Sequence, residues 1–250
     1  MSELVRLSVA DGVATVILDS QHNRNALSRA LVGELSDALR AAAADSSAKA
    51  IVLRSAHRVF CSGADMSEAV EGGMETGARG LVALLRQVVT CPKPVVAVLM
   101  GPVRAGGIGI VGACDIVVAS SEATFAFTEA RLGLTPAVVS LTTLSRMNDR
   151  DAARTYLTGG TFDGTEAARI GLVTRAVPAH EVEAALGEVL AGLAQATPQG
   201  LRETKHLLNT RLLAEIDEHG DDLAASSARL FASEEARQAM AAFLSKRADG

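Results

Sequence analysis

Aromatic side chains are scarce in this sequence. Tryptophan is absent and aromatic residues make up only 3% of the chain, whereas 48% of its 250 residues are apolar. This composition excludes a disordered chain, and alanine, valine, leucine and glycine must build the core. A chain of this length forms one large domain or two small ones and buries enough surface to support an active site.

Cysteine is rare as well. Cys61, Cys91 and Cys114 form no CxxC pair and have no histidine cluster beside them. We therefore expect neither a disulfide framework nor a metal site, and we interpret Cys61 and Cys114 as buried, small apolar side chains. Unpaired cysteines of this kind are typical of a reducing compartment, which favours a cytoplasmic location.

Long apolar runs and runs of basic residues are also lacking. No segment reaches the roughly 18 apolar residues of a membrane span, and the N-terminal stretch carries charges at Glu3 and Arg6, unlike a signal peptide. The 24 basic and 29 acidic residues give a net charge of -5, and the basic ones are scattered. Neither a membrane nor a nucleic acid is an expected partner.

Short apolar segments alternate with helical ones in the first half of the chain. Asp11-Gly12 between two apolar segments predicts a β-hairpin. Leu31, Leu35 and Leu39 behind Ser28 predict an amphipathic helix over 28–44. Further strands are predicted at 50–55, 94–100 and 115–120, with a helix over 78–89. Strands that alternate with helices indicate an α/β fold.

The character changes after Thr135, where helices dominate. They are predicted near 136–146, 149–157, 163–169, 179–196, 199–214 and 221–245, with one short strand at 172–177. We divide the chain into a core of residues 1–195 and a C-terminal helical region of residues 196–250. The second region has leucines on more than one helix face, which predicts that it covers a neighbouring subunit; these are Leu201, Leu207, Leu208, Leu212 and Leu213.

Gly107, Gly109 and Gly112 match the G-x-G-x-x-G pattern of dinucleotide-binding units. Such a unit needs the first glycine directly after a strand and a full crossover helix behind it. Here the preceding strand ends several residues earlier, and only a short helix fits before the strand at 115–120. We interpret the segment instead as a short buried helix whose first N–H groups point at a ligand oxygen.

The loop from Phe60 to Met66 is a second small-residue segment after a buried strand. Taken alone, it reads as a tight turn that caps the next helix. Taken with the Gly107 segment, it offers unhindered backbone N–H groups from two strand ends. Such donors stabilise the developing enolate charge of a thioester without using a side chain.

The chain resembles the enoyl-CoA hydratase/isomerase, or crotonase, family over nearly its whole length. The resemblance rests on several motifs in order rather than on one of them. They are Asn23 to Ser28, Ala50 to Arg54 with Phe60 to Asp65, Pro92 to Ala97, Gly101 to Asp115, Phe127 to Gly133, Gly171 to Val173, and Ala242 to Arg247.

The resemblance implies a crotonase-like ββα spiral with two roughly perpendicular sheets and a C-terminal helical trimerisation region. It implies a homotrimer or a dimer of trimers, an acyl-CoA thioester substrate, and no cofactor beyond the coenzyme A of that substrate. The N–H groups of Ala64 and Gly106 would form an oxyanion hole. Lys246 would reach coenzyme A from a neighbouring subunit. The other implied contacts to substrate or coenzyme A are Arg24, Ala26, Leu27, Ser62, Asp65, Met66, Gly107 and Thr128.

Glu129 matches the second of the two carboxylates that two-glutamate hydratases of the family use, whereas the first falls on Gly109. Without the resemblance, Glu129 reads as an exposed acid paired with Arg131. With it, Glu129 is the general acid/base of a 2-enoyl-CoA hydratase. Isomerases of the family act with one glutamate, so Δ3-to-Δ2 enoyl-CoA isomerisation is an alternative. A catalytically weak acyl-CoA-binding homologue is another, and the sequence gives no account of Arg104.

Overall fold

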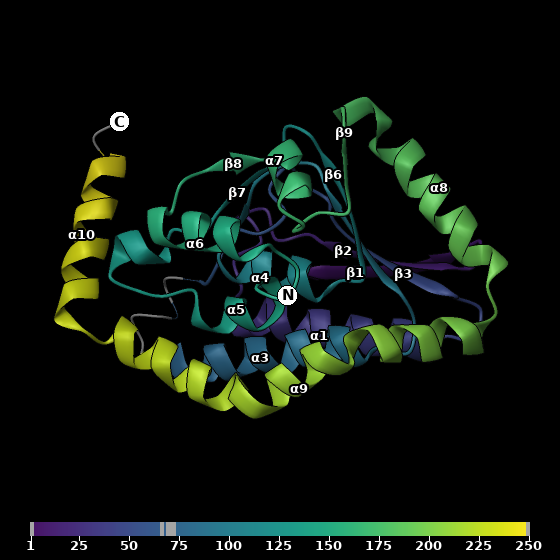
Figure 1. Cartoon of the computed structure of the whole chain (residues 1–250), viewed down its shortest axis with the longest axis horizontal. Coiled ribbons are helices and arrows are strands. Elements are labelled where there is room, and N and C mark those ends of the chain that lie inside the picture. The colour runs from purple at the N-terminus through teal and green to yellow at the C-terminus, as the bar shows by residue number, and fades with distance from the viewer. Residues whose placement is uncertain (1–2, 66–67, 69–73, 249–250) are drawn as a thin grey trace.

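The computed structural model describes residues 3–65, 68 and 74–248, and the side chains of 243–248 are not part of that description. It contains two sheets surrounded by helices, as the α/β prediction requires (Figure 1). The larger sheet consists of β1 (Val5–Ala10), β2 (Val13–Leu18), β3 (Ala50–Ser55), β4 (Val95–Leu99), β6 (Ile116–Ser120) and β9 (Arg175–Val177). The smaller sheet consists of β5 (Val103–Arg104), β7 (Thr124–Ala126) and β8 (Phe162–Asp163).

Helices cover these sheets. They are α1 (Arg29–Ala44), α3 (Met74–Thr90), α4 (Gly106–Ala113), α5 (Ala137–Thr143), α6 (Asp149–Thr158), α7 (Gly164–Arg169), α8 (Val182–Gln195), α9 (Pro198–Phe231) and α10 (Glu234–Ala248), with short 3-10 turns η1 (Glu129–Leu132) and η2 (Ala179–Glu181). Figure 1 shows α8 and α10 at opposite ends of the molecule. No described helix is both long enough and apolar enough to cross a bilayer.

The first elements confirm the local predictions. β1 and β2 pair antiparallel around Asp11 and Gly12, which both have positive φ, as a tight hairpin turn between twisted strands requires. The Ser28 hydroxyl accepts the N–H of Leu31 and caps α1. The large sheet continues in the order β1-β2-β3-β4-β6-β9, parallel from β2 onward.

All residues of β4 are buried. Because successive side chains of a strand point to opposite sides of the sheet, both faces of β4 are covered. Val95, Ala97 and Leu99 belong to the main core, which also contains the buried faces of α1 and α3. Val96 and Val98 belong to a second core beneath α8. The large sheet is therefore the middle layer of the molecule, which explains why its central strands read as continuous apolar runs.

The C-terminal helices differ from the prediction. The expected break between 214 and 221 does not exist, because α9 runs unbroken from Pro198 to Phe231. Gly220 lies inside this helix, and a Cβ there would meet Val82 of α3 at 2.8 Å. The glycine thus permits close packing of two helices rather than ending one. The proposed division after residue 195 falls between α8 and α9 and stays a prediction.

None of the three strands of the small sheet was predicted. β7 has three residues, and β5 and β8 have two each, so none is long enough to show a strand periodicity in the sequence. β7 and β8 pair with each other through Phe125 and Phe162, and β7 pairs in parallel with β5. This small sheet positions the candidate site.

Candidate active site

Three segments that are far apart in the sequence run side by side in the same direction. Cys61 forms a parallel bridge with Val103, and Val103 pairs in parallel with Phe125. Parallel neighbours reach the same edge of a sheet, where ligands of α/β proteins usually bind. The residues that follow these three positions therefore lie at one edge of the small sheet.

The sequence-predicted catalytic residues come next on these three segments. Ala64 lies three residues after Cys61, and Gly106 lies three residues after Val103. Thr128 lies three residues after Phe125, with Glu129 directly behind it. The common register brings both predicted oxyanion amides and the predicted acid/base to the same edge.

The loops before Ala64 and Gly106 touch one another. The Arg104 N–H donates to the Cys61 carbonyl at 3.0 Å. This hydrogen bond connects the two loops, although they are far apart in the sequence. A Cβ on Gly63 would lie 3.1 Å from the Cβ of Ala105. Gly63 and Ala105 both have positive φ, +101° and +44°, a conformation that an alanine adopts only under strain.

The thiol of Cys61 lies between these loops. It accepts the N–H of Gly63 at 3.4 Å and that of Gly107. A Cβ on Gly107 would meet the Cβ of Cys61 at 2.6 Å, so glycine is required there. Burial raises the pKa of the Cys61 thiol to about 12, so this cysteine is a neutral packing residue and not a nucleophile. All three cysteines are buried and unpaired, which confirms the predicted burial of Cys61 and Cys114.

The backbone N–H groups of Ala64 and Gly106 are unpaired among the described residues, with Ala64 exposed and Gly106 buried. Gly106 is the first residue of α4, where an N–H has no partner within its helix. Within the part of the chain that the structure describes, neither amide donates to a protein acceptor. Ala64 is exposed, so a ligand has access to its backbone. That both amides point at one oxygen stays a prediction.

A third loop, residues 23–27, lies along the Ala64 loop. The Leu27 N–H donates to the Gly63 carbonyl at 2.8 Å, and the Ser62 N–H donates to the Arg24 carbonyl at 3.2 Å. The Asn23 amide donates to Asp65 at 3.1 Å. The structure therefore brings together the predicted coenzyme A contacts of both loops; Arg24 is exposed, Ala26 is buried, and Leu27, Ser62 and Asp65 are half-buried.

Asn25 anchors that third loop, a role that the sequence reasoning missed. Its side chain is fully buried and donates to the Ser55 hydroxyl and to the carbonyls of Val59 and Phe60. Its carboxamide oxygen accepts the Ser20 N–H at 2.8 Å. Asn25 is a polar residue inside the 23–28 motif, and this position is the signal that could have indicated the role. Buried amides of this kind are costly unless every hydrogen bond is satisfied.

Two of the predicted coenzyme A contacts, Met66 and Lys246, are not covered in full by the described residues. Met66 lies outside the described residues, and so does the side chain of Lys246. The helix that carries Lys246, α10, begins against η1 of its own chain, because a Cβ on Gly133 would lie 3.1 Å from the Ala236 nitrogen. The tail helix thus lies beside the Glu129 segment of the same subunit, and its predicted approach from a neighbouring subunit stays untested.

Glu129 is the most unusual ionisable group at this edge. Its Oε2 is buried without a hydrogen-bond partner among the described residues. Burial raises the pKa of the Glu129 carboxyl from the ordinary 4.5 to about 7. Arg131 is not its partner, because the Arg131 guanidinium donates to the Thr158 carbonyl. The alternative of an exposed acid paired with Arg131 is therefore wrong. A carboxyl with a pKa near 7 is suited to both giving and taking a proton.

The place of the missing second carboxylate is apolar. A Cβ on Gly109 would contact the Cα of Val139 at 3.5 Å and a methyl group of Leu85 at 3.6 Å. Both distances are ordinary van der Waals contacts, so the position has room for a Cβ. The described residues also contain no group of three or more His, Cys, Asp or Glu side chains placed to hold a metal ion.

Arg104, which the sequence left unexplained, joins two strands of the small sheet. Its guanidinium donates to the Thr124 carbonyl at 2.6 Å and to the Thr124 hydroxyl at 3.0 Å. Burial lowers the pKa of the guanidinium, which nevertheless stays charged. Arg104 thus fixes β5 against β7, and with them the segments that carry Gly106 and Glu129.

Comparisons with known proteins show the family and the fold of this chain. Residues 8–249 match the family model described as enoyl-CoA hydratase/isomerase. A crystal structure of an enoyl-CoA hydratase from Mycobacterium avium superimposes with a TM-score of 0.93 and 44% identity, covering 98% of each chain. This similarity confirms the predicted crotonase fold.

Two relatives, from Clostridium acetobutylicum and Pseudomonas fluorescens, carry names for different reactions. The short-chain-enoyl-CoA hydratase of Clostridium acetobutylicum is 30% identical over 240 residues, which is 94% of this chain and 92% of the relative. The hydroxycinnamoyl-CoA hydratase-lyase of Pseudomonas fluorescens is 31% identical over 214 residues, which is 81% of this chain and 76% of the relative. The similarity therefore extends over proteins whose names describe more than one CoA-thioester reaction.

Proposed function

Because this chain belongs to the enoyl-CoA hydratase/isomerase family, we propose that it adds water reversibly to the double bond of a 2-enoyl-CoA thioester. The observation that carries the proposal is the common register of three parallel segments at one edge of the small sheet. That register supports a site in which the unpaired N–H groups of Ala64 and Gly106 and the Glu129 carboxyl, with its buried Oε2, act on one substrate. Relatives named enoyl-CoA hydratase support the same reaction.

In the proposed mechanism, the Ala64 and Gly106 amides donate to the thioester oxygen. They stabilise the negative charge that develops on this oxygen when water adds at the β-carbon. Glu129 moves the proton between the water and the α-carbon on the same face, which gives syn addition. Because the pKa of Glu129 is about 7, both protonation states are populated near neutral pH.

We propose that the two loops around Ala64 bind coenzyme A through the residues named above, with Gly107 and Thr128 at the thioester end. The reaction needs no cofactor beyond the coenzyme A of the substrate. We also propose a homotrimer or a dimer of trimers, which the exposed Leu207 and Leu208 of α9 support. A cytoplasmic location remains part of the same proposal.

A second candidate reaction is Δ3-to-Δ2 isomerisation. The apolar surroundings of Gly109 favour it, because water has no second carboxylate to hold it there. An isomerase needs only one group to carry a proton from one carbon to another. The third candidate is an acyl-CoA-binding homologue with weak catalysis.

One set of assays separates these candidates. A hydratase removes the absorbance of the conjugated thioester when it hydrates crotonyl-CoA. An isomerase produces that absorbance from a 3-enoyl-CoA, and calorimetry with a saturated acyl-CoA measures binding without catalysis. We expect Glu129→Gln to lower turnover by about 10²- to 10⁴-fold while acyl-CoA affinity changes by less than about threefold. A variant that keeps most of the activity refutes the role of Glu129, and turnover of only the 3-enoyl-CoA replaces hydration by isomerisation.

A further inference from the structure

Tyr156 is the only tyrosine of the chain, and it lies on the helix that packs against the Glu129 segment. The last turn of α6 contacts η1 through Arg131, whose guanidinium donates to the Thr158 carbonyl at 2.7 Å. A Cβ on Gly159 would lie 3.0 Å from the same guanidinium. The end of α6 is therefore held against the residues that follow Glu129.

The Tyr156 ring is fixed at both ends. Its centroid lies 4.4 Å from that of Phe127, which is two residues before Glu129. Its hydroxyl forms a hydrogen bond with the Thr143 hydroxyl of α5. Because Thr143 already donates to the Val139 carbonyl at 2.8 Å, Tyr156 must be the donor in that bond. The phenol proton is thus used in the bond to Thr143.

Tyr156 lies close to the Glu129 carboxyl without a hydrogen bond to it. Burial raises the pKa of the Tyr156 phenol, and the charge of the nearby Glu129 carboxylate raises it further. Glu129 Oε2 is nevertheless without a partner among the described residues. The rings of Phe127, two residues before Glu129, and Tyr156, on the helix packed against η1, therefore form an apolar pair next to the Glu129 segment.

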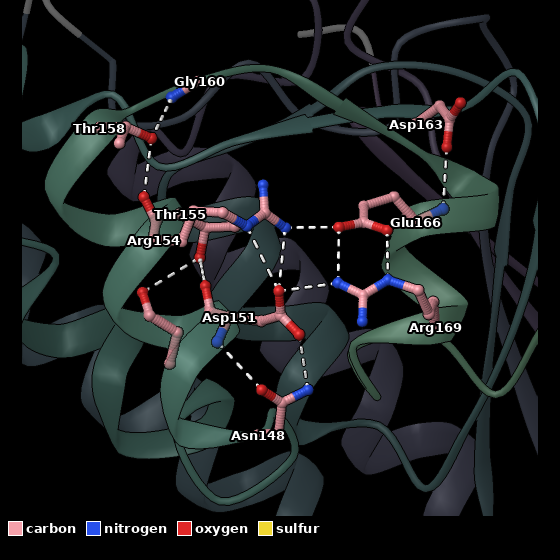
Figure 2. Close-up of polar contacts among 10 residues, drawn as sticks. Asn148, Asp151, Arg154, Thr155, Thr158, Gly160, Asp163, Glu166 and Arg169 are labelled. Carbon is pink, nitrogen blue, oxygen red and sulfur yellow. Dashed lines mark hydrogen bonds and ion pairs between the residues drawn. The ribbon is translucent and has the colours of Figure 1, made fainter.

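α6 itself is anchored to α7 by ion pairs. Figure 2 shows Asp151 and Arg154 of α6 paired with Glu166 and Arg169 of α7. The Asn148 side chain accepts the Asp151 N–H at 3.0 Å and caps the helix. This network holds the helix that presents Tyr156.

Within the described residues, the other charged side chains of η1, and those of α6 and α10 that pack against it, form no ion pair with Glu129. Arg131 of η1 binds Thr158, Asp151 and Arg154 of α6 belong to the network of Figure 2, and Glu234 of α10 pairs with Arg237. The remaining groups are exposed, namely Asp149, Arg150 and Glu235. Burial is accordingly the cause that raises the pKa of Glu129.

We propose that Tyr156 is a positioning residue whose ring closes an apolar wall on one side of Glu129 and keeps bulk water from that side of the carboxyl, which leaves the opposite side for the substrate and its water. The inference rests on the proposed function, because it assigns Tyr156 a part in preparing the proposed acid/base. The hydroxyl serves to fix the ring through Thr143, and the ring excludes water.

The first test is the pH dependence of kcat/KM with crotonyl-CoA, or with a 3-enoyl-CoA if only that is turned over. In Tyr156→Ser, we expect the pKa that controls kcat/KM to move toward 4.5 by about one pH unit or more, because water then solvates the carboxylate. Tyr156→Phe keeps the ring and leaves this pKa within about 0.3. Leu157→Ser is the matched control, since Leu157 is the next residue of α6 and is 79% exposed.

The second test needs no activity. The melting temperatures of wild type, Glu129→Gln, Tyr156→Ser and the double variant form a cycle at pH 8.5. Glu129→Gln is expected to raise the melting temperature of the parent, and this gain should fall by at least half in the Tyr156→Ser background. If Tyr156→Ser does not fold, Tyr156→Val takes its place.

The two proposals fail in different ways. An unchanged kcat/KM profile in Tyr156→Ser, together with an unchanged gain in the cycle, overturns the role of Tyr156 and leaves the proposed function intact. If Tyr156→Ser lowers the melting temperature but changes neither the kcat/KM profile nor the gain from Glu129→Gln, the role of Tyr156 is likewise overturned, because a purely structural residue gives this result. If Glu129→Gln retains activity, the proposed function fails, and the cycle still tests whether Tyr156 shields the carboxyl.

Discussion

Replacement of Glu129 by glutamine should stabilise the protein in a pH-dependent manner. In the unfolded chain the carboxyl titrates near its ordinary pKa of 4.5, whereas in the folded protein burial raises the pKa to about 7. Folding therefore favours the protonated form. The stability that this group contributes is fully present below pH 4.5 and is lost as the pH rises through about 7. Glutamine has a similar size and does not titrate.

The structure gives the size of the effect. The interval from 4.5 to about 7, at about 1.4 kcal/mol for each pH unit, corresponds to about 3 kcal/mol at alkaline pH. For a chain of this length, about 1 kcal/mol shifts the melting temperature by roughly 2–4 °C. Glu129→Gln should thus gain roughly 6–12 °C over wild type between pH 4.5 and pH 9, most of it by about pH 7.

Thermal unfolding of both proteins at pH 4.5, 7 and 9 measures this gain. The protein concentration must be the same throughout, because subunit association adds a concentration-dependent contribution to stability. Other titrating groups occur in both proteins and cancel in the difference. A difference in melting temperature that stays constant within about 1 °C over this pH range refutes the argument that Glu129 is buried with a raised pKa.

Three further predictions concern the glycines and the subunit interface. Gly107→Ala should lower kcat/KM by about 10²-fold or more, because the added Cβ collides with Cys61 and forces apart the loops before Ala64 and Gly106. Gly187→Ala is the control, because Gly187 has open space around it and its replacement should leave kcat/KM unchanged. Equal kinetics of the two variants contradict the assignment of these loops. Gly109→Glu should raise hydration of crotonyl-CoA relative to Gly109→Ala, and equal rates argue against water binding as the limiting step. Light scattering at micromolar concentration should give the mass of a trimer or hexamer, and replacing the exposed Leu207 and Leu208 by serine should lower that mass; a monomeric wild type refutes the predicted assembly.

The sequence by itself predicted the elements whose signals are local. A hairpin turn at Asp11-Gly12 and a Ser28 cap depend on a few adjacent residues, and both occur as predicted. The motif order from Asn23 to Arg247 indicated the family, which the comparisons confirm. The same motifs named Glu129, because the match specifies one position in the chain.

Only the tertiary structure decided the features that depend on distant contacts. The sequence predicts separate helices near 199–214 and 221–245, but α9 is continuous, and Gly220 within it packs closely against Val82 of α3. Arg131 lies two residues after Glu129 along the chain, yet its guanidinium binds the Thr158 carbonyl of α6. The surroundings of Glu129 follow from this arrangement, since burial by segments far apart in the sequence raises its pKa. A sequence gives the identity of a carboxyl, whereas its desolvation is a property of everything packed around it.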